Sequence, residues 1–493
     1  MKKIILLLAL TVYVCTTQAQ SFEWAKRAGL WSFDLGYAIG TDDAGNVYIS
    51  GKYERNAVFG NTTVSCAGNH DIYVAKYGSD GSFKWVRTAG GKSGDYTHAM
   101  CVDGSGNVYI TGEIEYTVNF GSGVSLTSNG GNDIFVAKYN TNGDLQWARK
   151  LGGSSKSDKG LGITLSNGYL YVTGNFQGNA NFAGTTISSY GGLDIFLAKY
   201  STAGALQWVK KAGSSGDDEG YAICSDASGN FYVTGYFTGT ANFGGISLSS
   251  SGGMDIFMAK YNSSGSVIWA KRAGGGATDY GTGIAIDNSG KIYLTGGFRS
   301  TSYFGSIQMK SQGNADIFVA CYNNSGTPIW VKKAGGDLSD YGRAIALDGN
   351  SNSYITGNFG HSATFGSTTI NGVDSTEIFF ASYDASGNFR WVLKATGEAD
   401  ASDPNRYIEM GLSIALDHSG NVYGSGTYRS NSTFGSTTLK TWDHTDIFVT
   451  KIRQSGTPSQ DGKFMTAQSS PDTTSYPCIP GIISTGSTTF CPG

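Results

Sequence analysis

The chain has 493 residues, of which 15% are charged, and it contains 73 glycines, 29 tyrosines and 25 phenylalanines. A net charge of -3 supplies no basic surface for nucleic acid, and no run of like charges indicates a membrane-surface patch. This composition disfavours a helical or disordered chain and predicts a β-rich, turn-rich extracellular protein.

The N-terminus, MKKIILLLALTVYVCTTQAQ, combines two lysines, an apolar run and a small-residue ending. This is the three-part pattern of a secretory signal peptide, so we expect residues 1–19 to be removed by cleavage after Ala19. A lipid anchor at Cys15 is the less favoured alternative, because Val14 is bulkier than the residue that normally precedes such a site. No other apolar run is long enough to span a bilayer, and we expect no transmembrane segment.

Seven tryptophans recur at nearly constant spacing, 61 residues apart in five intervals and 62 in one. Three further phrases lie between successive tryptophans, with GYAIGTD, NVYITG and DIFVAKY as examples. Each phrase is a short β-branched and aromatic run bounded by turn residues, which is the signature of a strand. Four strands in each of seven units predict a radial array of sheets. The seven residues are Trp24, Trp85, Trp147, Trp208, Trp269, Trp330 and Trp391.

The two ends of the repeat region are offset by one strand. Residues 21–28 form a Trp-bearing strand before any other phrase, whereas no such strand follows residues 446–452. The N-terminal strand can therefore complete the last blade and leave no unpaired edge. We predict an all-β fold, a monomeric seven-bladed β-propeller over residues 20–456 with four strands per blade. Small residues in phrases such as GIAI place these strands innermost, with the Trp strands outermost.

The phrase D-x-S-G-N, at residues 103–107, 226–230 and 417–421, is predicted to form the turn between the first two strands of a blade. Glycine supplies a positive φ there, and the aspartate accepts hydrogen bonds from its own turn. Calcium loops need several carboxylates at alternate positions, and each of these turns has one.

The order of phrases resembles the bacterial secreted β-propeller repeat, often called the SBBP repeat, from residue 21 to about residue 456. The resemblance implies a propeller that is secreted or carried on the outer-membrane surface, frequently of Bacteroidetes-type bacteria. It implies no settled activity and assigns no functional residues. The tail, residues 457–493, is rich in Ser, Thr and Pro, and its last phrase is similar to the opening of immunoglobulin-like adhesin repeats. Either the chain stops where such a domain would begin or the likeness is accidental.

The cysteines and histidines give no catalytic or metal-binding pattern. Cys478 and Cys491, close together in the tail, are the only candidates for a disulfide. The single cysteines between the tryptophans, among them Cys66 and Cys321, lack the paired spacing of zinc sites and are expected to be small buried hydrophobes. Five histidines fall at unrelated positions of different units, so we do not expect an enzyme.

One acidic residue precedes the inner strand in every unit, usually eight positions before the turn aspartate. If these carboxylates ring the channel mouth, they are candidate ligand-binding residues for calcium, sugar hydroxyls or basic side chains. The alternative, which strict repetition favours, is that each one caps its own loop and ties blade to blade. A second repeated acid opens the DIF phrase and has the same structural interpretation. The first set is Asp34, Asp95, Asp158, Asp218, Asp279, Asp340 and Glu409, and the second is Asp71, Asp133, Asp194, Asp255, Asp316, Glu377 and Asp446.

Asymmetric loops are the better candidates for a ligand site. Residues 395–411 form the one large insertion, with Arg406 and Tyr407, and residues 213–221 and Trp31 with Phe33 are expected on the same face. Aromatic rings beside carboxylates are a common way to hold carbohydrate. A merely longer loop is the alternative interpretation of the insertion.

These features predict a surface binding module of an adhesin-like protein that recognises a protein or a glycan and needs no cofactor. A polysaccharide hydrolase or lyase that uses loop carboxylates is the alternative, and a spacer without a ligand is the third hypothesis.

Overall fold

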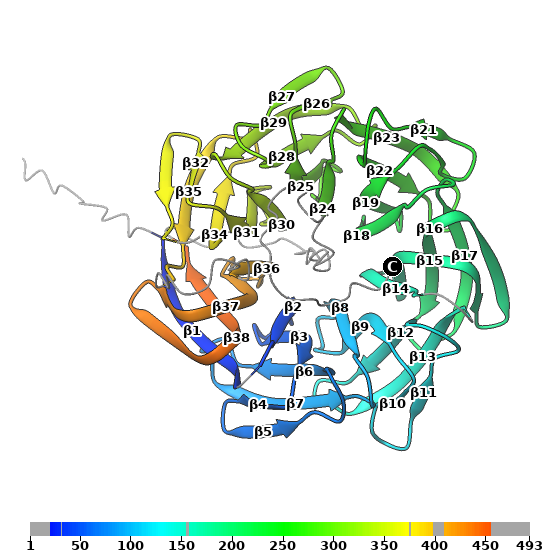
Figure 1. The fold of residues 1–493 in the computed structure, drawn as a ribbon, viewed down its shortest axis with the longest axis vertical. Coiled ribbons are helices and arrows are strands. Elements are labelled where there is room, and N and C mark those ends of the chain that lie inside the picture. Colours follow the sequence, from blue (N-terminus) through cyan, green and yellow to red (C-terminus); the bar gives the residue numbers. More distant parts are fainter. Residues whose placement is uncertain (1–19, 31, 154–156, 374–375, 398–408, 455–493) are drawn as a thin grey trace, which may run out of the picture.

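The computed structural model describes residues 20–30, 32–153, 157–373, 376–397 and 409–454. Within these residues every regular element is a β-strand, which confirms the predicted all-β class. The sheets radiate from a central axis and curl around it (Figure 1). None of the described segments forms a helix that is long and apolar enough to cross a bilayer.

The innermost strands follow one another around the axis. β2 lies beside β8, and the succession continues through β14, β18, β24 and β30 to β36, which lies beside β2 (Figure 1). Small residues allow the close approach, because a Cβ on Gly283 would lie only 3.1 Å from the backbone nitrogen of Ile345 in the next inner strand. The inner strands are β2 (Leu35–Thr41), β8 (Tyr96–Val102), β14 (Lys159–Ser166), β18 (Glu219–Ser225), β24 (Tyr280–Ile286), β30 (Tyr341–Leu347) and β36 (Met410–Leu416).

Each inner strand starts an antiparallel sheet whose next members are the second strand, the DIF strand and the Trp strand. The second strands are β3 (Val47–Tyr53), β9 (Val108–Ile114), β15 (Tyr169–Phe182), β19 (Phe231–Phe237), β25 (Ile292–Phe298), β31 (Ser353–Phe359) and β37 (Val422–Phe434). The DIF strands are β6 (Asp71–Tyr77), β12 (Asp133–Tyr139), β16 (Thr185–Ser201), β22 (Asp255–Tyr261), β28 (Asp316–Tyr322), β34 (Glu377–Tyr383) and β38 (Thr437–Arg453). The Trp strands are β7 (Phe83–Ala89), β13 (Leu145–Gly153), β17 (Leu206–Ala212), β23 (Val267–Gly275), β29 (Pro328–Gly335), β35 (Phe389–Lys394) and β1 (Ser21–Leu30).

A hairpin between the second and DIF strands adds pairing that the sequence did not predict. Each hairpin leaves its own unit and pairs with the end of the Trp strand of the preceding unit, as β26 does with β23 and β4 with β1. In the third and last units the hairpin is continuous with the long strands β15, β16, β37 and β38. The separate hairpin strands are β4 (Asn56–Phe59), β5 (Thr62–Ser65), β10 (Thr117–Asn119), β11 (Ser125–Thr127), β20 (Thr240–Asn242), β21 (Ser247–Ser249), β26 (Thr301–Phe304), β27 (Ile307–Lys310), β32 (Ser362–Phe365) and β33 (Thr368–Asn371).

The first and last described strands pair with each other. β1 runs antiparallel to β38, with Ala28 opposite Ile447 and Trp24 opposite Lys451. The ring nitrogen of Trp24 donates to the carbonyl of Ser79, in the turn that joins the last two strands of the next unit. Trp391 Nε1 is buried and has no hydrogen-bond partner in the described part of the chain. In the unit that follows Trp391 the last two strands are β38 and β1, which come from opposite ends of the chain, so no turn joins them.

The turns between the first two strands have the predicted construction. Asp103 Oδ1 accepts hydrogen bonds from the backbone nitrogens of Ser105 and Asn107 at 3.1 and 2.8 Å, and Asn107 Nδ2 donates to Asp103 Oδ2 at 2.8 Å. The turn aspartate is thus occupied by its own loop, as the sequence indicated.

Candidate functional site

The first set of repeated acids lies buried between neighbouring units. The Asp340 carboxylate accepts hydrogen bonds from the backbone nitrogens of Gly336, at the end of β29, and Gly360, at the end of β31, at 2.7 and 2.8 Å. The Asp340 backbone nitrogen donates to the Ala315 carbonyl at 2.8 Å. One side chain therefore connects two successive sheets.

The same arrangement recurs around the axis. Glu409, which is longer by one methylene, instead takes a side-chain bond from Ser432 at 2.8 Å and a long one, 3.4 Å, from the Arg429 backbone. The other five members bind backbone nitrogens four or five residues before them and 19 or 20 residues after them, and they are Asp34, Asp95, Asp158, Asp218 and Asp279.

In five units a glycine lies between the first-set acid and the DIF aspartate of the preceding unit. At Gly335, where φ is 147°, a Cβ would lie 2.9 Å from both Asp340 Oδ2 and the Asp316 carboxyl carbon. Only glycine adopts this conformation without strain and leaves room for both carboxyl groups. Gly29, Gly152, Gly213 and Gly274 have positive φ and lie in the same way between two acids.

Burial raises the pKa of these carboxyls, although the backbone N–H bonds oppose the shift. The pKa is about 8 for Asp34, about 7 for Asp95, Asp158 and Asp340, and about 6 for Asp218 and Asp279. The described residues contain no group of three His, Cys, Asp or Glu side chains that could hold a metal ion. The hydrogen bonds of the first-set carboxyls join successive sheets.

Three positions at the start of the inner strand vary between units, and we call them the mouth belt. The third residue of the strand forms a bulge, and a bulge redirects a side chain. These bulge residues are Tyr37, His98, Leu161, Tyr221, Thr282, Arg343 and Leu412. The first strand residues are Leu35, Tyr96, Lys159, Glu219, Tyr280, Tyr341 and Met410. Opposite these lie Lys52, Glu113, Asn175, Tyr236, Gly297, Asn358 and Thr427.

One sector of the mouth belt is a charge-balanced network. Glu113 contacts His98 Nε2 at 3.0 Å and Lys159 Nζ at 3.7 Å, and it accepts a hydrogen bond from Asn132 Nδ2 at 2.6 Å. Burial of Glu113 opposes its ionisation, but these donors outweigh burial and lower the pKa to about 2. The His98 ring stacks on Tyr96 with centroids 6.1 Å apart.

The opposite sector is rich in tyrosine and arginine. Tyr236 OH donates to Glu219 Oε1 at 2.9 Å, and the Tyr236 and Tyr280 rings meet edge to face at 5.8 Å. Arg299, just after β25, donates from Nη2 to Tyr341 OH at 3.1 Å. The Arg343 guanidinium lies 5.3 Å from the centroid of the Tyr341 ring. Aromatic rings beside charged groups are suited to binding polar ligands.

The asymmetric loops are described only in part. Phe33 is 38% exposed and stacks on His444 at 4.6 Å, and in the 213–221 loop Asp217 accepts a bond from the Leu193 backbone at 2.9 Å. The remaining sequence candidates lie outside the described residues, namely Trp31, Arg406, Tyr407, Cys478 and Cys491.

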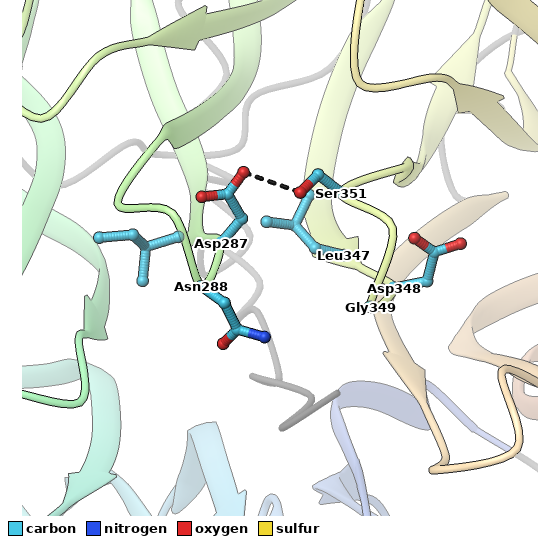
Figure 2. Close-up of a pocket in the computed structure, with 7 residues that line it drawn as sticks. Asp287, Asn288, Leu347, Asp348, Gly349 and Ser351 are labelled. Atoms are coloured by element: carbon cyan, nitrogen blue, oxygen red, sulfur yellow. Dashed lines mark hydrogen bonds between the residues drawn. The ribbon is translucent and has the colours of Figure 1, made fainter. Parts of the chain in front are cut away.

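The turns at the other end of the inner strands enclose only a shallow polar hollow. It lies between the turn after β24 and the turn after β30. Figure 2 shows Ser351 pointing at Asp287, to which its hydroxyl donates at 2.8 Å. The hollow offers no aromatic face to a ligand.

Comparison with known proteins supports a β-propeller repeat scaffold. Residues 268–296 and 329–358 match the family model described as the beta-propeller repeat, SBBP. The chain is 24% identical to an uncharacterized WD repeat-containing protein of Acanthamoeba polyphaga mimivirus, over 82% of this chain and 36% of that protein. It is 25% identical to the regulatory protein FlaEY of Caulobacter vibrioides, over 38% of this chain and 21% of that protein. The matches thus span about a third or less of these relatives.

Two solved structures align with most of this chain. A quinohemoprotein alcohol dehydrogenase from Comamonas testosteroni aligns with 90% of this chain and 78% of its own, at 10% identity and a TM-score of 0.40. The WD40 domain of SCAP from fission yeast aligns with 86% of this chain and 96% of its own, at 9% identity and a TM-score of 0.34.

Sequence reasoning missed the mouth belt. The signal was present as the position where otherwise similar phrases disagree, as in GYAI at residues 36–39, THAM at 97–100 and GRAI at 342–345. Here one residue changes between Tyr, His and Arg while its neighbours hardly change. Most of these bulge residues are buried, among them Tyr37, Leu161 and Leu412, whereas Arg343 is half-buried.

Proposed function

We propose that this chain is an exported β-propeller module that binds a protein or a glycan at the mouth belt and needs no cofactor. The observation that carries the proposal is the combination of tyrosine, histidine, arginine, lysine and glutamate at belt positions that the repeat leaves variable. Half-buried rings such as Tyr280 and Tyr341 provide apolar faces, and their charged neighbours provide hydrogen bonds. The signal sequence and the repeat resemblance support placing it on a bacterial surface, in an adhesin-like protein.

A binding role also fits the state of the repeated carboxyls better than catalysis does. Glycoside hydrolysis requires two carboxyl groups that reach the scissile bond. Asp316 and Asp340 are a close pair, but both are fully buried and bound to backbone N–H groups. Turnover of any polysaccharide by the purified protein would overturn the proposal in favour of a hydrolase or lyase.

The test is a glycan and protein-ligand screen on the mature chain. Hits are then measured with Tyr280→Ala and Tyr341→Ala, and with Asn288→Ala as a control on the exposed turn at the other end of the strands. We expect the tyrosine variants to lose affinity and the control to keep it. Equal affinity in all variants would place the ligand elsewhere, and calcium-dependent binding would contradict the absence of a cofactor.

We also propose that the radial array is a seven-bladed ring closed by the N-terminal strand. Two observations support this proposal. The inner strands β2, β8, β14, β18, β24, β30 and β36 contact one another in a closed succession, and β1 pairs with β38. Deletion of residues 20–30 is expected to expose the β38 edge and cause association, whereas a monomer of unchanged stability would count against closure.

A further inference from the structure

We propose that the sector of the mouth belt around Arg299 and Arg343 binds the carboxylate or sulfate group of an acidic glycan. This inference rests on the binding role proposed above and names the ligand class for one part of that surface. It starts from the two arginines that converge on one tyrosine ring.

The Tyr341 ring holds both guanidinium groups in place. Its hydroxyl accepts the bond from Arg299 Nη2, and its face lies beside the Arg343 guanidinium. Arg343 Nε also donates to Asn358 Oδ1 at 3.2 Å. The ring packs on Gly297, where a Cβ would lie 2.5 Å from Tyr341 Cδ1. The arginines are therefore preorganised by fixed neighbours, which lowers the entropic cost of binding.

The charges of these two arginines are not balanced in the described structure. Neither guanidinium forms an ion pair with a described residue, whereas Lys159 in the opposite sector is paired with Glu113. Arg299 Nε is buried and has no hydrogen-bond partner among the described residues. The nearby Asp279 carboxylate accepts bonds from the backbone nitrogens of Gly275 and Arg299 at 2.8 and 2.9 Å. Asp279 acts on Arg299 electrostatically but forms no ion pair with it, so an anionic ligand would supply the first direct ion pair to these guanidinium groups among the described residues.

The groups around the arginines indicate an acidic sugar. A guanidinium matches a carboxylate or sulfate through two parallel N–H bonds. Half-buried Tyr280 and Tyr341 supply ring faces beside the cations, and the Glu219 carboxylate can accept hydroxyl bonds next to Tyr280. A ring face, a cation and an acceptor together suit a uronate or a sulfated sugar better than a neutral one.

Calorimetric titration of the mature chain tests the proposal. The probes are a tetragalacturonate, a sulfated tetrasaccharide, a neutral tetrasaccharide and a poly-glutamate peptide. The variants are Arg299→Gln and Arg343→Gln, with Arg272→Gln as the control, since Arg272 is an arginine already paired with Asp255 at 3.2 Å. We expect an acidic tetrasaccharide to bind, the Arg299 and Arg343 variants each to weaken binding about tenfold or more, and the control to change Kd less than about twofold.

Arg343→Lys is the second variant, to be used if Arg343→Gln unfolds. It keeps the positive charge but loses the planar guanidinium, so it should also weaken binding. Equal binding of neutral and acidic sugars, preference for the peptide, or unchanged affinity in both glutamine variants would overturn the inference. Neutral-sugar binding that still depends on Tyr280 and Tyr341 would leave the proposed function standing. If no probe binds and the ligand screen finds no ligand, both the acidic-glycan inference and the proposed binding function are contradicted.

Discussion

Two sets of polar residues lie within a few positions of each other and behave in opposite ways. An acidic residue occupies the position of Asp340 in every unit, and Asp340 is fully buried with its carboxylate oxygens bound to backbone N–H groups. Arg343 has no arginine at the equivalent position of another unit and remains partly exposed. A polar residue that repeats strictly in this fold therefore packs between sheets. Under the proposed function, departure from the repeat at a half-buried position such as Arg343 marks the surface where a ligand would bind.

The pH dependence of stability tests the role of the buried first-set carboxyls at all interfaces between sheets together. Folding raises the pKa of six first-set carboxyls from 3.8 to between about 6 and about 8. The folded chain therefore binds more protons than the unfolded chain in this range, and stability present below about pH 4 is lost as pH rises through about 6 to 8. We expect Tm to rise on acidification from about pH 8 to about pH 5. A Tm that falls over this interval would contradict the assignment.

Removal of one repeated acid should be the most damaging single change. Asp95→Ala leaves the backbone nitrogens of Gly91 and Glu115 buried without their acceptor. We expect a loss of about 3 kcal/mol in the free energy of unfolding, measured by chemical denaturation. Asp80→Ala serves as the control, because Asp80 lies in an exposed turn. Equal stabilities of the two variants would show that the acids do not join the sheets.

The glycine between the paired acids should be nearly as sensitive. Gly335→Ala places a Cβ against Asp316 and Asp340 at a φ of 147°. We expect a loss of about 2 kcal/mol, compared with less than about 0.5 kcal/mol for alanine at the exposed Gly276, where a Cβ would meet no atom within 4 Å beyond the adjacent residues. A crystal structure that shows both carboxyls unmoved in Gly335→Ala would argue against the close pair.

The indole nitrogens of two equivalent tryptophans, Trp330 and Trp391, offer a smaller test of how the sheets close into a ring. Trp330 Nε1 donates to the Ala385 carbonyl at 3.2 Å, whereas Trp391 Nε1 has no partner among the described residues. Trp330→Phe should therefore cost about 1 kcal/mol more than Trp391→Phe, as measured by the denaturation midpoint. Equal costs would imply that Trp391 finds a partner at the junction of the chain ends.

The fold was more accessible to sequence analysis than the site. The regular tryptophan spacing and the offset of one strand at the ends indicated the radial array and the pairing partner of β1, because both depend on residues repeated within each unit. The hairpins such as β26 and β27 were missed, since each strand has only four residues and β26 pairs with the Trp strand of another unit as well as with β27.

The burial of the acids and the composition of the mouth belt required the tertiary structure. The sequence placed Asp340 before an inner strand, but only the structure shows its carboxyl bound to the backbone of Gly360, just after β31. Tyr341 and Asn358 are 17 positions apart and become neighbours through the register of β30 and β31. A scan for repeated motifs discards such positions because they vary between units.

The most direct test compares Asp340→Asn with Arg343→Gln in one thermal-shift titration with the tetragalacturonate. The account predicts that Asp340→Asn lowers Tm markedly but keeps the ligand-induced shift, because the substitution weakens an interface between sheets. Arg343→Gln should keep Tm within about 1 °C and lose most of the ligand-induced shift. An Asp340→Asn protein with unchanged Tm and no response to the ligand, beside an Arg343→Gln protein that responds like the parent, would contradict it.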